Sequence, residues 1–179
     1  MSSSATNFRI EPLGDHDRSG FACEAAPLER YLKEQAGQEG RKGVAATFLL
    51  LTDDDLIAGF YTLSSTNIRT DDLSAELVKK LKLPRYQHLP ATLLGRLARD
   101  TSFRGQGIGE LLLLDALKRA HRHSKEIASI AVIVDAKDQR AVRFYKDFGF
   151  EEFADSKDRL FIRMDTIGKL GLPLQGDAR

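Results

Sequence analysis

The sequence has a single cysteine and no long apolar run, and both absences narrow the class of protein. Cys23 is the only cysteine among 179 residues, so an intrachain disulfide and a cluster of thiolate metal ligands are excluded. No apolar stretch reaches the roughly 20 residues needed to cross a bilayer, and the first residues lack the basic start and apolar middle of a secretion signal. We expect a cytoplasmic protein that contacts no membrane.

The excess of one charge sign is also small, since the net charge of the whole sequence is only +1, but basic and acidic residues are distributed unevenly. Residues 75–125 contain eleven Lys and Arg against four Asp and Glu, a net of +7, which leaves −6 for the remainder. Such a cluster favours a polyanionic ligand, either a cofactor phosphate or a nucleic-acid backbone. An ordinary solvated basic face explains it equally well.

Apolar periodicity predicts one α/β domain over residues 1–179, with a core at about 8–164 and a C-terminal tail at 165–179. The three aspartates at 53–55 are expected to form a hairpin turn, because no further ligands follow at calcium-loop spacing. Residues 37–43 are expected to form a flexible basic loop. The expected strands are 8–10, 44–52, 57–65, 91–98, 127–134 and 159–164, and the expected helices are 27–36, 71–83, 110–123 and 138–148.

A glycine-rich segment lies between the expected strand 91–98 and the amphipathic helix 110–123. Its residues are Arg104, Gly105, Gln106, Gly107, Ile108 and Gly109. Closely spaced glycines let the main chain approach a ligand, and the free N–H groups of a first helical turn can bind a pyrophosphate. The segment lacks the Gly-Lys-Ser/Thr ending of a nucleotide-triphosphate loop and the Gly-x-Gly-x-x-Gly spacing of a dinucleotide fold. A purely structural turn remains the alternative.

Two motifs resemble the GNAT acetyltransferases. Arg104-x-x-Gly107-x-Gly109 is similar to the Arg/Gln-x-x-Gly-x-Gly/Ala signature of that superfamily. Asp138-x-x-Ala141-x-x-Phe144-Tyr145-x-x-Phe148-Gly149-Phe150 resembles the element that closes its cofactor site, although asparagine is commoner at position 138. The resemblance implies a mixed, mostly antiparallel central sheet flanked by helices, and acetyl-coenzyme A as co-substrate without a metal. It also implies cofactor contacts by the backbone of Leu97 and Ala98, by residues 104–109, and by Asp138, Ala141 and Phe144.

Tyr145 is the expected general acid. A phenol with a pKa of about 10 stays protonated at neutral pH and can donate to a departing thiolate, whose conjugate thiol has a pKa of about 8.5. Simple aromatic packing of Tyr145 is the alternative interpretation. No general base stands out, but an α-amine with a pKa near about 8 needs little help to lose its proton.

Finer similarity points to the acetyltransferase toxins of bacterial type II toxin–antitoxin modules. It is carried by short segments at residues 21–36, by Leu94-Gly95-Arg96-Leu97-Ala98 and by Val134-Asp135-Ala136-Lys137. The resemblance implies acetylation of the α-amino group of aminoacyl-tRNA, inhibition of translation, a ribbon-helix-helix antitoxin and a homodimer. Arg99 departs from the small apolar residue that is usual at its position.

Basic side chains of the same region are candidates for contacts with tRNA phosphates. A single basic side chain of this kind is more often solvated than in contact with a phosphate. Two other functions stay open: an acetyltransferase acting on small molecules or protein N-termini, and a nonenzymatic acetyl-coenzyme A-binding regulator. The tRNA candidates are Arg85, Arg96, Arg99, Lys118, Arg119 and Arg122.

Overall fold

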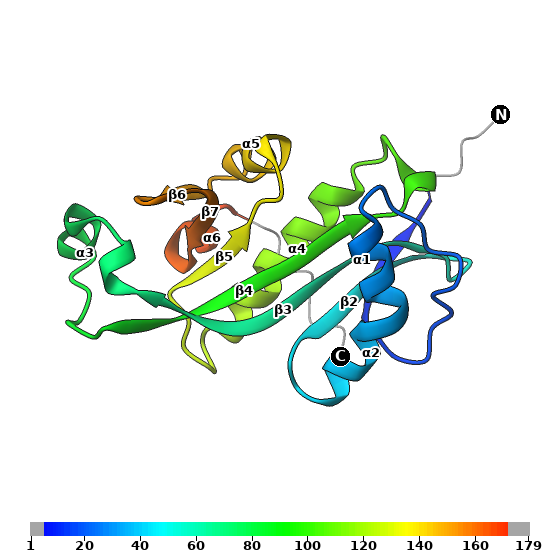
Figure 1. Cartoon of the computed structure of the whole chain (residues 1–179), viewed down its shortest axis with the longest axis horizontal. Helices are drawn as coiled ribbons and strands as arrows, with labels where there is room; N and C mark the ends of the chain where they lie inside the picture. Colours follow the sequence, from blue (N-terminus) through cyan, green and yellow to red (C-terminus); the bar gives the residue numbers. More distant parts are fainter. Residues whose placement is uncertain (1–5, 172–179) are drawn as a thin grey trace. The chain divides into compact units, whose positions relative to one another are not determined.

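The structure is a computed structural model that describes residues 6–171. Its seven strands form a sheet in the order β1-β2-β3-β4-β5-β7-β6, in which β5 lies parallel to β4, whereas β1–β2, β2–β3, β5–β7 and β6–β7 are antiparallel (Figure 1). The predicted α/β class, with a mixed and mostly antiparallel sheet flanked by helices, is confirmed. The strands are β1 (Phe8–Pro12), β2 (Ala46–Thr52), β3 (Ile57–Arg69), β4 (His88–Arg99), β5 (Ala131–Asp135), β6 (Glu151–Phe153) and β7 (Ser156–Arg163).

The helices connect these strands, and short 3-10 or π segments join some of them. No helix within residues 6–171 is long and apolar enough to span a bilayer. The α-helices are α1 (Ala26–Arg30), α2 (Ala36–Arg41), α3 (Ala75–Lys80), α4 (Ile108–His123), α5 (Gln139–Asp147) and α6 (Met164–Lys169). The π-helix is η1 (Tyr31–Gln35), and the 3-10 segments are η2 (Thr70–Asp72) and η3 (Thr101–Phe103).

The chain forms two compact units. Unit 1 contains described residues 6–64 and 95–116, and unit 2 contains described residues 65–94 and 117–171. β3, β4 and α4 each contribute residues to both units. Each unit is described separately below.

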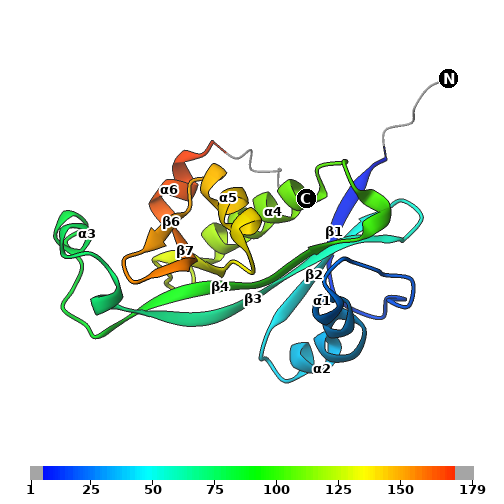
Figure 2. The same ribbon diagram turned by 45° about the horizontal axis from the view of Figure 1, so that its top comes forward.

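In unit 1, helices cover both faces of the strands (Figure 2). On one face, Tyr31 and Leu32 of η1 and Ala36 of α2 pack against Leu49 and Phe60 of the sheet. On the other face, the hydroxyl of Tyr61 on β3 donates a hydrogen bond to the Asp115 carboxylate of α4. This two-sided cover explains why most of β2 and the first half of β3 are buried.

The first helical segment is longer than the sequence suggests. Helical structure runs without a break from Ala26 through η1 to Arg41, so the predicted loop at 37–43 is wrong. Leu32 and Ala36 are 0% and 1% exposed, and their burial offsets the cost of about 1 kcal/mol for each glycine inside a helix. The chain turns only at Gly43, where φ is +70°.

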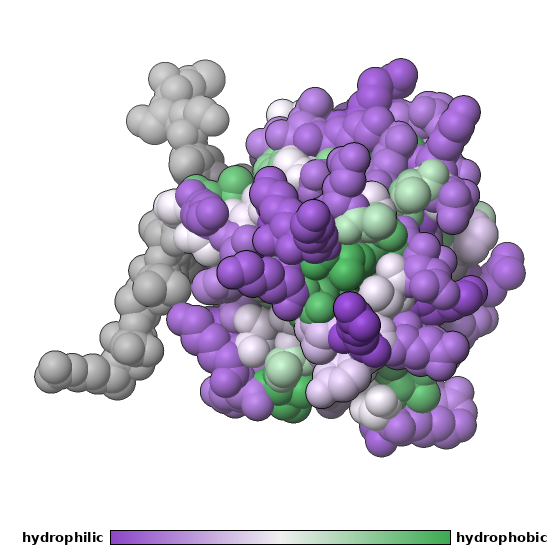
Figure 3. Space-filling model, turned by 90° about the vertical axis from the view of Figure 1, so that its left-hand side faces the viewer, coloured by the Kyte–Doolittle hydropathy of each residue, from purple (hydrophilic) through white to green (hydrophobic). Residues whose placement is uncertain are grey.

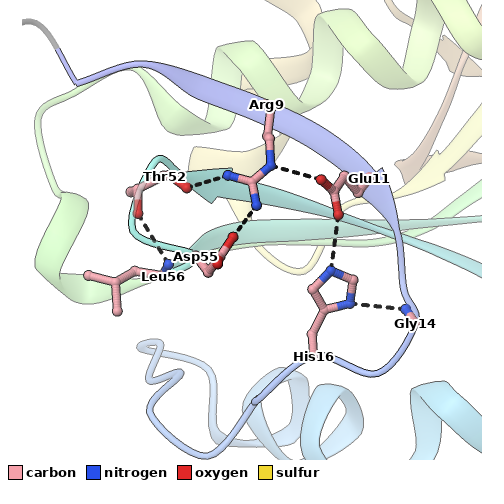
Figure 4. Close-up of polar contacts among 7 residues, drawn as sticks. All are labelled: Arg9, Glu11, Gly14, His16, Thr52, Asp55 and Leu56. Carbon is pink, nitrogen blue, oxygen red and sulfur yellow. Dashed lines mark hydrogen bonds and ion pairs between the residues drawn. The ribbon is translucent and has the colours of Figure 1, made fainter.

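A polar network fastens β1 to the turn between β2 and β3 (Figure 4). The Arg9 guanidinium donates to Glu11 at 2.8 Å, to the carbonyl oxygen of Thr52 at 2.6 Å, and to the Asp55 carboxylate. His16 lies 3.2 Å from the second Glu11 oxygen. The Arg9 hydrogen bond, followed by that of His16, lowers the pKa of Glu11. The three aspartates therefore form a turn, as predicted, and Asp55 adopts a left-handed φ of 62°.

In unit 2, β5 is buried on both faces. Ala131 and Ile133 belong to an apolar cluster with Phe161 of β7, and Val132 and Val134 are also 0% and 1% exposed. The predicted strand 127–134 is shorter than expected, because Ile127 lies in a turn and is 79% exposed. The apolar character of residues 127–130 misled the prediction, since periodicity alone does not locate strand ends.

The predicted C-terminal tail is also partly wrong. Residues 164–169 form α6, in which Met164 and Ile167 are buried. β6 was not expected either, and it pairs with β7 through Glu151 and Phe161. The rest of the tail, residues 172–179, lies outside the described residues.

A hollow lies beside α3 in unit 2. Figure 3 shows apolar side chains gathered there and surrounded by hydrophilic ones. α3 itself is short and has no buried residue, so the predicted helix 71–83 is reduced to residues 75–80, preceded by η2. The hollow has a volume of about 230 Å³, and its lining includes Ile68, Leu73, Leu77, Leu83, Ile130 and Phe161.

Candidate functional site

The glycine-rich segment links η3 to the start of α4 in unit 1. Gly105 and Gly107 have φ values of +80° and +72°, a left-handed conformation that side chains rarely adopt. No atom lies within 4 Å of a Cβ built at either position, so backbone conformation is what requires glycine here. Residues 104–107 are exposed, whereas Ile108 is 1% exposed and anchors the helix.

The main-chain amides of this segment fall into two groups. The amides of Arg104 and Gln106 donate to the carbonyl oxygens of Thr101 and Phe103, both at 3.4 Å. The first bond of the α4 ladder runs from the amide of Leu111 to the carbonyl oxygen of Gly107 at 3.1 Å. The amides of residues 107–110 therefore precede the ladder, and such groups at the positive end of a 16-residue helix can bind an anion.

Gly59 on β3 lets α4 approach the sheet closely. A Cβ at this position would lie 2.8 Å from the carbonyl oxygen of Ala98 and 2.8 Å from Cδ1 of Leu112. Ile108, the first residue of α4, would lie only 3.1 Å away. The absence of a side chain at Gly59 therefore places the first turns of α4, and with them the free amides, against β3 and β4.

Asp100 joins the end of β4 to the segment before α1. Its carboxylate is 5% exposed and accepts hydrogen bonds from the amides of Ala22 at 2.9 Å and Ser102 at 2.8 Å. The amide of Thr101 donates to the carbonyl oxygen of Ala22 at 2.9 Å. The two bonds to Ala22 hold this residue beside Asp100 and Thr101, just before the glycine-rich segment.

Glu24 follows Ala22 by two residues, and its carboxylate lies close to two arginines. One of its carboxylate oxygens pairs with the Arg104 guanidinium and lies 3.8 Å from that of Arg99. The Arg99 side chain is 28% exposed, and its buried Nε has no hydrogen-bond partner among the described residues. Two cationic groups thus converge on a single anionic oxygen.

Arg96, another tRNA candidate, has a different environment. Its guanidinium lies over the Tyr31 ring, 3.5 Å from the centroid, and 3.9 Å from the Glu39 carboxylate. The Tyr31 hydroxyl donates to the same carboxylate at 2.7 Å, and burial, followed by this hydrogen bond, raises the Tyr31 pKa. A cation–π contact of this kind holds Arg96 against α1–α2 and explains its presence without a ligand.

The second motif forms α5 in unit 2. Asp138 caps the helix through a 2.8 Å hydrogen bond from the amide of Ala141, in agreement with the expected helix start. At the other end Gly149 has a φ of +97°, a left-handed conformation that commonly ends a helix. Asp138 is therefore occupied as a helix cap, a role that asparagine would perform equally well.

Tyr145 lies on the buried face of α5. The ring is 9% exposed, and its centroid lies 5.3 Å from that of Phe144 and 5.3 Å from that of Phe150. Burial raises the pKa of Tyr145 to about 12, so the phenol is neutral and able to donate a proton at physiological pH. Aromatic packing by itself also accounts for the buried ring.

The other predicted tRNA ligands lie in unit 2. Arg85 is exposed and, with Lys79 and Lys82, lines a cavity of about 590 Å³. Lys118 and Arg119 are half-buried on α4, and Arg122 is exposed there. Of the predicted residues, the structure brings Arg99 together with Arg104, and it brings Asp138, Ala141, Phe144 and Tyr145 together on one helix.

Sequence analysis missed three residues that shape the site. Gly59 carried a signal, because a glycine inside a strand often marks a close approach of another segment. Asp100 carried a weaker one, since aspartate before Thr-Ser favours a turn in which its side chain accepts a backbone N–H. Glu24 carried none, because it is 80 residues away from the arginine that it contacts.

Comparisons with known proteins agree with these features. Residues 15–165 match the family described as "Acetyltransferase (GNAT) domain". The chain is 28% identical over 171 residues to "Probable toxin TacT" of Sinorhizobium fredii, which covers 90% of this chain and 93% of the relative. It is 30% identical over 135 residues to "tRNA-acetylating toxin" of Mycobacterium tuberculosis, which covers 75% of this chain and 78% of the relative.

A solved structure, "AtaT complexed with acetyl-methionyl-tRNAfMet", superposes with a TM-score of 0.83 at 28% identity and covers 92% of this chain and 99% of the other. The family match spans both units and includes the glycine-rich segment and α5. The chain therefore belongs to the GNAT acetyltransferases.

Proposed function

We propose that this acetyltransferase moves an acetyl group from acetyl-coenzyme A to the α-amino group of aminoacyl-tRNA and thereby stops translation. The main-chain donors that precede the ladder at the start of α4, together with the two arginines that converge on Glu24, carry the proposal because they suit a polyphosphate ligand. The names of the relatives support the acceptor, since one acetylates tRNA and another was solved with an acetylated aminoacyl-tRNA.

The cofactor residues follow from the motifs. Residues 104–109 form the pyrophosphate site, in which the amides of Gly107, Ile108 and Gly109 are the main donors because those of Arg104 and Gln106 already bond to Thr101 and Phe103. The Arg104 guanidinium adds a charge-assisted contact. The main chain of Leu97 and Ala98 pairs with the pantetheine arm in the manner of an added strand. Asp138, Ala141 and Phe144 complete the contacts from α5.

The proposed chemistry needs little acid–base help. The neutral α-amine attacks the thioester carbonyl, the new C–N bond forms, and the C–S bond breaks as the thiolate departs. Before the attack the ammonium form loses one proton to water, because its pKa near about 8 leaves a usable neutral fraction at pH 7. Tyr145, which burial keeps protonated, donates its proton to the departing thiolate. The nitrogen loses its second proton once the C–N bond has formed, and that proton restores the phenol through water.

The contacts with tRNA phosphates are proposed to come from basic side chains, whose charge attracts the RNA backbone. Arg96 is the weakest member of the predicted set, because Tyr31 and Glu39 already hold its guanidinium. Phosphate contacts of this kind position an RNA without reading its sequence. The remaining candidates are Arg85, Arg99, Lys118, Arg119 and Arg122.

We further propose the context in which the enzyme works. It acts as one domain over residues 1–179 in the cytoplasm, where charged tRNA occurs. A ribbon-helix-helix antitoxin neutralises it, and the active form is a homodimer. The toxin names of its relatives support the antitoxin proposal, and an isolated complex with the product of a neighbouring reading frame would test it.

A direct assay separates this function from its alternatives. Purified protein is incubated with labelled acetyl-coenzyme A and a mixture of charged tRNAs, and deacylated tRNA serves as the control. We expect label only on charged tRNA and arrest of a cell-free translation reaction. Labelling of free amines or protein N-termini alone would reject the tRNA substrate, and cofactor binding without transfer to any amine would favour a nonenzymatic regulator.

A further inference from the structure

The contact of Glu24 with two arginines lies where an anionic ligand would be expected. Arg104 and Arg99 approach one carboxylate oxygen from two different elements, the glycine-rich segment and the end of β4. Neighbouring residues bear the amides that precede the α4 ladder. Positive charge from two guanidinium groups therefore meets a single side-chain anion.

A glutamate and a phosphate oxygen are interchangeable partners for a guanidinium. Arginine binds either group through charge-assisted N–H donors, and its planar fork suits both geometries. The side chains of Glu24 and Arg104 are 51% and 66% exposed, so solvent screens their attraction and an exchange of partners has a low cost. The buried Arg99 Nε, which has no partner among residues 6–171, is a further donor for the incoming group.

We propose that Arg99 and Arg104 form a phosphate-binding site that the Glu24 carboxylate occupies until a phosphate displaces it. The inference deepens the proposed function and rests on it, because the expected ligand is a phosphate of acetyl-coenzyme A. Glu24 acts as an internal competitor that weakens cofactor binding. The anchoring of Ala22 by Asp100 and Thr101, two residues before Glu24, limits how far this competitor can move from the site.

The proposal predicts tighter ligand binding when the competitor loses its charge. Glu24→Gln should lower the dissociation constant for acetyl-coenzyme A by about threefold, a size typical of an exposed ion pair. Arg104→Ala should weaken binding, and Glu24→Gln should then have little further effect because its partner is gone. Isothermal titration calorimetry of the four proteins gives this double-mutant cycle.

Glu29→Gln is the matched control. Glu29 lies in the same region but pairs with Lys33 at 2.9 Å and accepts from the amide of Cys23 at 3.3 Å. Within residues 6–171 it makes no hydrogen bond or ion pair with Arg99 or Arg104, so its loss of charge should leave the dissociation constant within about 1.5-fold of the parent value. Equal tightening by both variants would indicate a general change in surface charge and overturn the site.

The source of the phosphate is decided by two further ligands. Acetyl-pantetheine, which lacks the nucleotide phosphates, should bind the Glu24→Gln variant and the parent equally. A deacylated tRNA provides the RNA arm, and tightening there alone would assign the site to an RNA phosphate. No change with either acetyl-coenzyme A or tRNA would overturn the site. If the parent protein bound no acetyl-coenzyme A, the proposed function would fail while the tRNA arm still decided the site.

Discussion

The glycine-rich segment of unit 1 and α5 of unit 2 offer functional groups in opposite ways. The segment offers main-chain donors that precede the α4 ladder, and two of its glycines serve the backbone conformation. α5 presents a side chain that is almost fully buried and whose pKa is raised by that burial. A site made of backbone can be inferred from glycine spacing, whereas the role of a buried aromatic depends on its surroundings.

The substitution with the largest expected effect is Tyr145→Phe, which tests whether the buried side chain of α5 has a chemical role. If the phenol donates a proton to the leaving thiolate, its removal should reduce turnover by about 100-fold or more. Acetyl-coenzyme A affinity should stay within about twofold, because the ring still packs between Phe144 and Phe150. Steady-state acetyl transfer and calorimetry measure the two quantities.

Tyr86→Phe provides the control for this experiment, since Tyr86 is also in unit 2 but is 67% exposed. It should leave turnover unchanged. If Tyr145→Phe kept full turnover, Tyr145 would be a packing residue only, and α5 would contribute no acid to the reaction.

Gly59→Ala tests how strongly the glycine-rich segment depends on the close approach of α4 to the sheet. The added Cβ would lie 2.8 Å from the carbonyl oxygen of Ala98, and a backbone atom cannot rotate away as a side chain could. We expect the free energy of unfolding to fall by about 1–3 kcal/mol, measured by urea denaturation, with weaker acetyl-coenzyme A binding. Gly20→Ala is the control, because no atom lies within 4 Å of its Cβ position, and it should change stability little.

Two substitutions of Asp138 test whether this residue of unit 2 only caps α5 or also contacts the cofactor. Asp138→Ala removes the cap of α5 and should cost about 1 kcal/mol of unfolding free energy. Asp138→Asn keeps an acceptor for the Ala141 amide and should be nearly neutral in stability. A loss of acetyl-coenzyme A affinity in both variants would show that the carboxylate contacts the cofactor beyond its capping role.

The smallest expected signal is spectroscopic. The folded pKa of Tyr145, about 12, exceeds the unfolded value of about 10. Stability from the neutral phenol is therefore complete below about pH 10 and is lost as the pH rises towards 12. The ultraviolet difference titration of the parent against Tyr145→Phe should place one tyrosinate step near pH 12, and a step near pH 10 would contradict the burial.

The elements predicted well were those with local signals. The helix expected at 138–148 is observed at 139–147, because a capping aspartate and a terminal glycine mark its two ends. The helix expected at 110–123 begins at Ile108, and its apolar register was clear. Residues 37–41 and 164–169 were misjudged, since their helices depend on buried contacts at Ala36, Met164 and Ile167.

The amino-acid sequence by itself determined the family, and it indicated residues 104–109 as a candidate anion site, because three glycines and a helix start fall within six consecutive residues. The tertiary structure decided what surrounds that segment. Only folding brings Glu24 to Arg104 across 80 residues and sets α4 against Gly59. It also buries Tyr145 and so raises its pKa. Contacts and desolvation of this kind depend on residues distant in the chain, and no local pattern encodes them.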